Sequence, residues 1–208
     1  MNLVKLFVCL FILVLVLSGC GKYGPPLAPE ALAPRTVENL TASASLGQVQ
    51  IEWQAPREDR RGEELKSIEG YEIYRIELLA DQPLPPYLAL EELYEKIAFI
   101  PDSHIEERER LRREARAKNQ PVRRVNVAPE LLEFSFVDKE LEGGRRYIYQ
   151  IRPVNQGGVE GDFFDTVQVF YRGDMSEVLV GPGLQSEREQ SDLQEGDQMQ
   201  DVAPDSIE

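Results

Sequence analysis

Cysteine and histidine are almost absent from this chain of 208 residues. It contains two cysteines and a single histidine, His104. Cys9 lies inside an apolar N-terminal run, so Cys20 is the one thiol in the rest of the chain. A zinc site with the usual cysteine and histidine ligands is therefore excluded. A disulfide within the folded part is excluded as well, so its stability must come from an apolar core.

Motifs for catalysis are also lacking. No nucleophile and base stand in a recognisable pairing, and no glycine-rich loop joins a strand to a helix for binding phosphate. Carboxylates are too numerous for any chosen pair to be informative. His104 stands at the start of a charged segment, which favours a surface position over a catalytic or metal-binding one. We therefore expect no enzyme activity, no catalytic residue and no metal.

Positive charge is scarce. The chain has 23 lysines and arginines against 37 carboxylates, which gives a net charge of −14. This balance disfavours binding to nucleic acid or to anionic membrane headgroups. Residues 184–208 hold eight carboxylates, one arginine and no aromatic residue. They are predicted to be a disordered tail that keeps the chain end soluble; binding of a basic partner or of divalent ions is the alternative.

No apolar run is long enough to cross a bilayer as a helix, which takes roughly 20 residues. The run at 6–17 has twelve residues and follows Lys5, as in a secretory signal peptide. We assign residues 1–19 to this signal peptide. The small residues Ser18 and Gly19 predict cleavage between Gly19 and Cys20; an uncleaved anchor with a buried cysteine is the alternative.

The segment Leu-Ser-Gly-Cys that ends at Cys20 resembles the lipobox of bacterial lipoproteins. The resemblance implies that the Cys20 thiol takes a diacylglycerol in a thioether and becomes the first residue after cleavage. Covalent lipid is then the one added group, with no other cofactor. Acyl chains such as palmitate would hold the protein on the membrane, because each buried methylene contributes about 0.8 kcal/mol. Gly21 after the cysteine favours the outer over the inner membrane of the bacterial envelope.

Residues 20–34 form a linker with four prolines. Such a composition favours a semi-rigid, extended spacer, with an unstructured tether as the alternative. The linker begins with CGKYGPPLAP, which resembles the start of the small lipoprotein that accompanies the lipopolysaccharide-assembly translocon. The matching positions are Cys20, Gly21, Gly24 and Pro25. This short resemblance implies a docking role in the envelope.

Residues 35–183 show the period-two pattern of half-buried strands. In QVQIEW, the apolar Val49, Ile51 and Trp53 alternate with polar residues, and YIYQI repeats the pattern; GYEIYRI is a third run of aromatic and β-branched residues. Short strands separated by turn residues predict an all-β, antiparallel sandwich.

The order of these segments resembles a fibronectin type III domain, an immunoglobulin-like fold. The family has a tryptophan in its second strand, a Gly-Tyr-x-Ile-Tyr opening in its third, and a leucine six residues before a tyrosine at the entry to its sixth. That tyrosine resembles the tyrosine corner, whose hydroxyl bonds to the backbone. The resemblance implies a core that contains Trp53, Tyr71, Ile73, Leu141, Tyr147 and Tyr149.

Two features depart from the family pattern late in the domain. Pro153 lies in the sixth strand and cannot donate to a ladder, so the pairing is expected to loosen or bulge there. Either DTVQVFY or SEVLVGP then supplies the seventh strand, and we favour the second.

A charged insertion at about 102–130 is predicted to contain a helix that Pro121 ends. Ser103 with Glu106 forms a possible capping box, and Asp102 is the alternative cap. Pairs of opposite charge four residues apart support the helix: Glu106 with Arg110, Glu109 with Arg113, and Glu114 with Lys118. With few apolar residues, the helix is expected to contribute little to the core.

The insertion is the most basic part of an acidic molecule. We interpret it as the candidate surface for a partner, with a plain solvated excursion as the alternative. Its arginines are Arg108, Arg112, Arg113, Arg116, Arg123 and Arg124. The sequence thus predicts a lipid-anchored envelope protein that presents a fibronectin type III-like domain for binding or assembly with another envelope protein. An accessory module for cell-wall or surface polysaccharide is the alternative.

Overall fold

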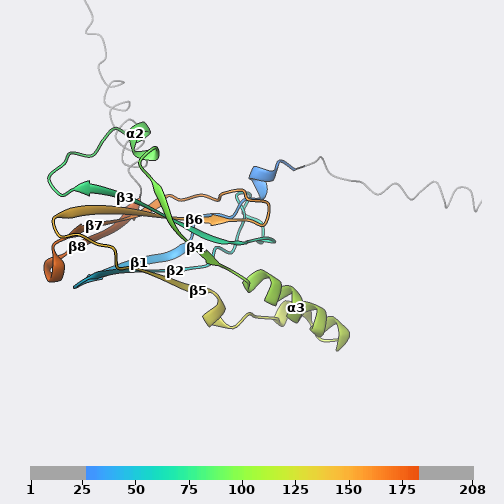
Figure 1. Cartoon of the computed structure of the whole chain (residues 1–208). Coiled ribbons are helices and arrows are strands. Elements are labelled where there is room, and N and C mark those ends of the chain that lie inside the picture. The colour runs from blue at the N-terminus through green and yellow to red at the C-terminus, as the bar shows by residue number, and fades with distance from the viewer. Residues whose placement is uncertain (1–26, 183–208) are drawn as a thin grey trace, which may run out of the picture.

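The computed structural model describes residues 27–182, which form two antiparallel sheets packed face to face (Figure 1). The smaller sheet has the order β1-β2-β5 and contains β1 (Glu38–Ser45), β2 (Gln48–Gln54) and β5 (Glu133–Asp138). The larger sheet has the order β4-β3-β6-β7-β8. Its strands are β3 (Gly70–Leu79), β4 (Glu95–Pro101), β6 (Arg145–Val154), β7 (Asp165–Tyr171) and β8 (Glu177–Pro182). The predicted all-β, fibronectin type III-like sandwich is confirmed.

The strand that follows β6 differs from our prediction. β7 contains DTVQVFY and pairs with β6, whereas SEVLVGP forms β8 at the outer edge, beside β7. β7 lies between β6 and β8, and all of its residues are buried or half-buried. β8, with Leu179 and Val180 exposed, is an additional edge strand.

Aromatic side chains fill much of the space between the two sheets. Trp53, Tyr71, Ile73, Tyr147 and Tyr149 are all buried. The ring centres of Trp53 and Tyr71 are 5.4 Å apart in an edge-to-face contact. This arrangement stabilises an aromatic pair by more than the burial of its apolar surface alone. The period-two pattern of the sequence arises from these inward-facing side chains.

A tyrosine corner joins the two sheets. The backbone N–H of Glu142 donates a 2.7 Å hydrogen bond to the hydroxyl of Tyr147, and Leu141 packs against the core. The turn before β6 is therefore fixed to the first inward residues of that strand.

Pro153 causes no bulge in the ladder with β3, and the expected loosening is absent there. Its carbonyl accepts a bond from Gly161 on the side away from β3. Because the nitrogen and oxygen of one strand residue point to the same edge, the missing N–H also faces away from β3. Pro153 still pairs with Tyr71 in register.

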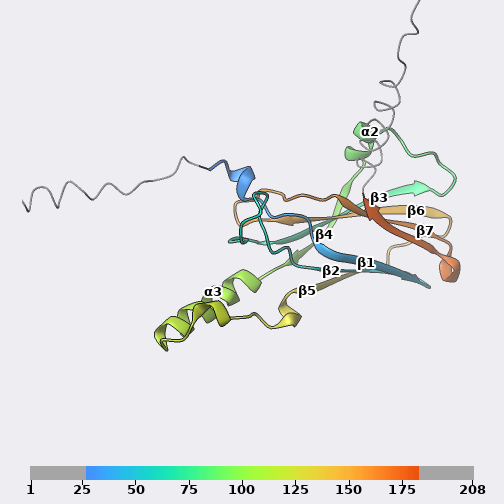
Figure 2. The same cartoon turned by 180° about the vertical axis from the view of Figure 1, so that it is seen from behind.

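The outer face of the larger sheet carries a second apolar cluster, which the sequence did not predict. The segment 80–94, with the short helix α2 (Tyr87–Glu91), passes over β3 and β6 (Figure 2). Leu90 packs there with Ile76, Leu78 and Ile148. This part of the sheet is consequently buried on both faces.

The remaining elements lie at the two ends of the sandwich. They are α3 (His104–Ala117) and the 3-10 turns η1 (Pro29–Leu32), η2 (Val122–Arg124), η3 (Pro129–Leu131) and η4 (Gly173–Met175). The predicted spacer therefore ends earlier than position 34, because η1 is folded and Ala33 is buried. Within residues 27–182, no helix has the length and apolarity needed to cross a membrane.

Candidate binding surface at the loop end

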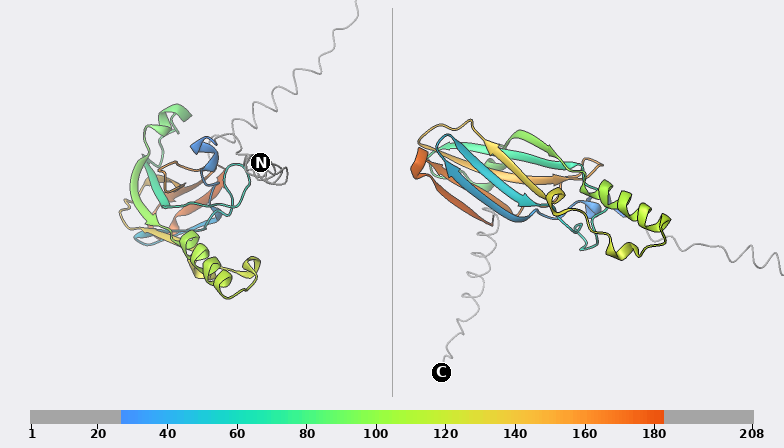
Figure 3. Two further views of the ribbon diagram at one scale, coloured as in Figure 1. Left: turned by 90° about the vertical axis from the view of Figure 1, so that its right-hand side faces the viewer. Right: turned by 90° about the horizontal axis from the view of Figure 1, so that it is seen from below.

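One end of the sandwich, here named the loop end, gathers the segments 55–69, 102–132 and 155–164. α3 projects from this end, between β4 and β5 (Figure 3). The insertion thus connects strands of different sheets, and its base lies over the core.

Asp102 caps the N-terminus of α3. Its Oδ1 accepts a 2.8 Å bond from the backbone N–H of His104, which satisfies one of the free donors of the first turn. The Ser103 side chain makes no capping bond. The capping box predicted for Ser103 and Glu106 is therefore wrong, and the alternative cap is the one that forms.

His104 is buried, so the predicted surface position is wrong. Its Nδ1 lies 2.8 and 2.9 Å from the two Asp102 oxygens, and the Tyr71 hydroxyl donates a 2.6 Å bond to Oδ2. Burial, the Asp102 charge and this hydrogen bond together raise the pKa of Tyr71 far above its ordinary value. The side chains bond to one another, and they join the core to the base of α3.

Two of the six candidate arginines hold α3 against the domain. Arg112 donates a 2.6 Å bond to Glu64, and Arg108 bonds to the Leu65 carbonyl while its guanidinium lies 3.3 Å from Glu64. The Arg112 bond, ahead of other causes, lowers the pKa of Glu64 below its ordinary value. Arg108 and Arg112 are thus largely buried anchors and do not present a surface to a partner.

The loop at 155–164 is bonded to the other two segments of this end. Gln156 donates a 2.8 Å side-chain bond to Glu106 of α3, and its backbone N–H bonds to Ser67. Arg60 pairs with Asp162 at 2.9 Å. α3 also inserts Ile105 into the main core. The helix is therefore fixed on the sandwich mainly by polar contacts, and it contributes one side chain to the main core, in line with the expectation that its share of the core is small.

The ion pairs along α3 differ from the three that we predicted. Arg110 pairs with Glu107 at 2.6 Å and also with Glu114, and Arg112 pairs with Glu109 at 2.8 Å. The helix ends before Pro121: Asn119 takes a positive φ of 53°, and Gln120 N–H bonds to the Ala115 carbonyl at 2.8 Å. This is a Schellman-type end.

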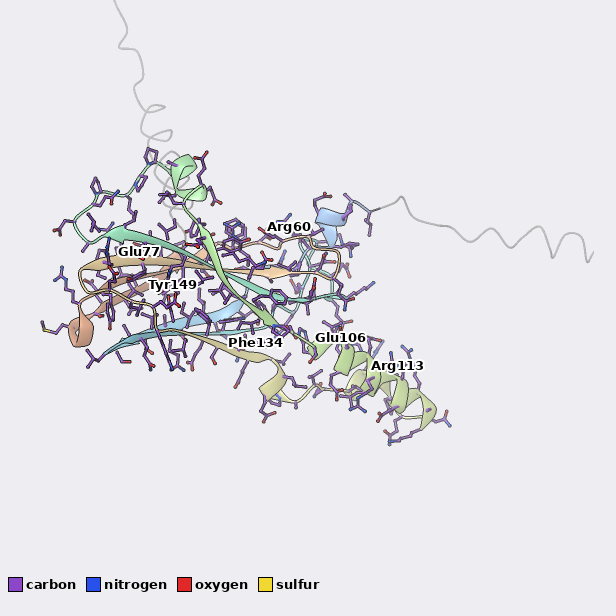
Figure 4. All side chains as sticks on the ribbon, viewed as in Figure 1. Arg60, Glu77, Glu106, Arg113, Phe134 and Tyr149 are labelled. Atoms are coloured by element: carbon purple, nitrogen blue, oxygen red, sulfur yellow. The ribbon has the colours of Figure 1, made fainter. Side chains whose placement is uncertain are left out.

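The outer part of the insertion presents exposed cations. Arg113, Arg116, Lys118 and Arg123 are exposed, and within residues 27–182 none of them is in an ion pair. Figure 4 shows Arg113 on the part of α3 that projects from the sandwich. The Arg124 side chain lies outside the described part of the structure.

Three aromatic side chains surround an arginine of β6. The Arg152 guanidinium carbon lies 4.1 Å from the Phe163 ring centre, 4.3 Å from that of Tyr74 and 5.6 Å from that of Tyr94. Arg152 also bonds to Gln150 at 2.7 Å. The three rings therefore form a cage around a side chain of the protein itself.

Several predictions fall beyond the described residues, among them the signal peptide, the cleavage between Gly19 and Cys20, lipidation of Cys20 and the acidic tail. Within the described range, no three histidine, cysteine, aspartate or glutamate residues are placed to hold a metal ion.

Comparisons with known proteins give structural similarity alone. No family model matches the sequence, and no curated protein matches it. The solution structure of the third fibronectin III domain of human KIAA0343 protein is 14% identical, with a TM-score of 0.39. The match covers 76% of this chain and 97% of that one. A chain in a structure described as "Myokine structure" is 13% identical, with a TM-score of 0.29 and coverages of 72% and 97%.

Proposed function

We propose that this protein is a lipid-anchored component of the bacterial cell envelope, held in the outer membrane through Cys20. It presents its fibronectin type III-like sandwich as a non-enzymatic module for binding or assembly with another envelope protein. The lipobox-like segment supports the anchor, and the sandwich supports the role as a module.

One observation carries the binding role: the insertion is held on the domain, but its outer arginines form no ion pair within the described residues. Arg108 and Arg112 fix α3 on the domain, whereas Arg113, Arg116 and Arg123 point outward and form no ion pair within residues 27–182. A preorganised surface loses little conformational entropy on binding. Arginine also forms paired hydrogen bonds with carboxylates, which gives a contact direction as well as charge.

A protein partner accounts for the surface better than a polysaccharide does. Binding to sugar rings would favour exposed aromatic faces in a row. Tyr74 and Phe163 stack on Arg152 instead, and the exposed Phe99 and Phe164 lie on separate segments, β4 and the loop 155–164. The charged insertion instead offers the pattern of charges that specifies one protein surface.

Lipidation is tested with Cys20→Ala. We expect this variant to remain soluble in the periplasm or to keep its signal peptide, and mass spectrometry of the mature protein to show that acyl chains are lost. Unchanged acylation would rule out the proposed anchor.

Partner binding is tested in living cells with a photoreactive amino acid at Ala117, an exposed position on the outer half of α3. We expect a defined protein adduct whose yield falls with Arg113→Glu and Arg116→Glu together. The control pair, Lys139→Glu with Arg172→Glu, makes the same charge change at the opposite end of the sandwich and should leave the yield unchanged. Glycan adducts, or equal yields in both pairs, would contradict the proposal.

A further inference from the structure

The N-terminal tether and α3 leave the sandwich at the same end. The Ala33 carbonyl accepts a bond from Arg60 N–H, and the Pro34 carbonyl accepts one from Asp162. The segment that contains Arg60 also contains Glu64, the partner of Arg112 in α3. Figures 1 and 3 both show η1 and α3 at this end. A membrane attached to the tether would therefore face the loop end.

The reach of the tether is comparable to the length of α3. Seven residue steps separate Cys20 from Leu27, the first described residue, and an extended proline-rich chain spans about 3.1 Å per residue, or about 22 Å in all. The 14 residues of α3 extend about 21 Å at about 1.5 Å per residue. The outer part of the insertion can thus lie at the level of the lipid headgroups.

The charge pattern of the insertion disfavours the lipid itself as the occupant. Residues 102–130 contain eight arginines and lysines and six carboxylates, a net charge of +2. Removal of residues 1–19, whose one charge is Lys5, takes the whole chain from −14 to −15. An anionic bilayer attracts segments of net positive charge, and each cation near its surface contributes about 1 kcal/mol to the binding free energy. A protein surface can instead match alternating charges position by position.

We propose that the exposed cations of the insertion (Arg113, Arg116, Lys118 and Arg123) dock on an acidic surface, close to the lipid headgroups, of a protein embedded in the same membrane as the Cys20 anchor. This proposal rests on the lipid anchor of the proposed function. To the proposed function it adds the location of the partner, in the same membrane, and the negative charge of the partner's docking surface.

Because the tether is short, a weak contact between the insertion and its partner is sufficient for binding. Two proteins held in one membrane meet at a high effective concentration, and this concentration falls as about the −3/2 power of the tether length. Lengthening the tether from seven to about 37 residues should lower it about tenfold.

The experiment uses the full-length, lipidated protein with the photoreactive residue at Ala117. A flexible Gly/Ser insert of about 30 residues is placed between Pro26 and Leu27. The matched control carries the same insert after Pro182, which leaves the tether unchanged. We expect the first insert to reduce the protein adduct about tenfold and the control insert to leave it unchanged. The adducted partner should stay in the membrane after a high-salt and carbonate wash.

Three results would overturn the inference: adducts with phospholipid or lipopolysaccharide alone, a partner that the wash releases from the membrane, or a yield that does not depend on the tether. The last two still show a protein partner and leave the proposed function intact. Absence of any protein adduct in every variant contradicts the proposed function as well, so the two failures are distinguishable.

Discussion

The Tyr71 hydroxyl and the Asp102 carboxylate are 2.6 Å apart, and both side chains are buried. Tyr71 belongs to β3 in the core, whereas Asp102 caps α3. This hydrogen bond therefore connects the sandwich to the insertion.

Removal of the Tyr71 hydroxyl should destabilise the domain. Tyr71→Phe leaves a buried carboxylate with one donor fewer, and hydrogen bonds to charged groups contribute about 1.5–3 kcal/mol. We expect a loss of this size in the free energy of unfolding, measured with urea. Tyr74→Phe removes a hydroxyl bonded to Glu72 at a half-buried position and should have a smaller effect. Equal losses in the two variants would contradict the role given to the buried bond.

His104→Ala should loosen α3 more than the sandwich. The substitution leaves space at the base of the helix and removes one of the groups that bond to the buried Asp102 carboxylate, and a lost hydrogen bond to a buried group is costly. Amide hydrogen exchange should rise in α3 while β6 and β7 stay protected. His104→Gln retains a donor of similar length and should restore part of the protection. If exchange is unchanged in α3, the buried imidazole does not anchor the helix.

Acid should weaken the contact between Glu64 and α3. The pKa of Glu64 is lowered from 4.5 in the folded protein, so its contribution is fully present above about pH 4.5 and is lost as the pH falls through the lower folded value. The Glu64 side chain is half-exposed, so solvent screening keeps the contribution below about 1 kcal/mol.

The matching measurement compares urea midpoints of the natural chain and Glu64→Gln from about pH 7 to about pH 3. The difference should be largest at neutral pH and disappear in acid. Glu130→Gln, an exposed substitution at η3, serves as the control. A difference that stays constant or grows on acidification would be opposite to the expected sign.

Gly70→Ala should be strongly destabilising. A Cβ built on Gly70 would lie 2.3 Å from the Ile100 carbonyl oxygen and 2.7 Å from the Phe99 ring. Backbone on the neighbouring strand must then move, and overpacking of this kind costs about 1–3 kcal/mol or more. Gly143→Ala, where no atom lies within 4 Å of the added Cβ, should change the melting temperature little.

The sequence predicted those parts of the fold that depend on neighbours along the chain. Trp53 and Tyr147 lie in short alternating segments, and alternation depends on the local geometry of a strand. The distant partners of Arg108 and Asp102 could not be predicted in this way. Leu65 is 43 residues from Arg108 and Tyr71 is 31 residues from Asp102, and local patterns carry no information on such contacts.

The seventh strand illustrates the same limit. Both DTVQVFY and SEVLVGP have the composition of a strand, and both form one. Which of them lies beside β6 depends on the length and path of the connection. In the structure, Arg145 pairs with Tyr171 in β7, and no periodicity in either segment indicates this choice.

Segment 80–94 covers part of the outer face of the larger sheet, and this limits how its sequence and length can vary. Surface loops ordinarily tolerate insertions and deletions, but here Leu90 is as buried as the strand residues Ile76 and Ile148 that it contacts. Shortening this loop would uncover apolar strand residues to water. Natural variants of this domain should therefore change loop length and the size of these three side chains together, whereas the exposed half of α3 should vary in length independently.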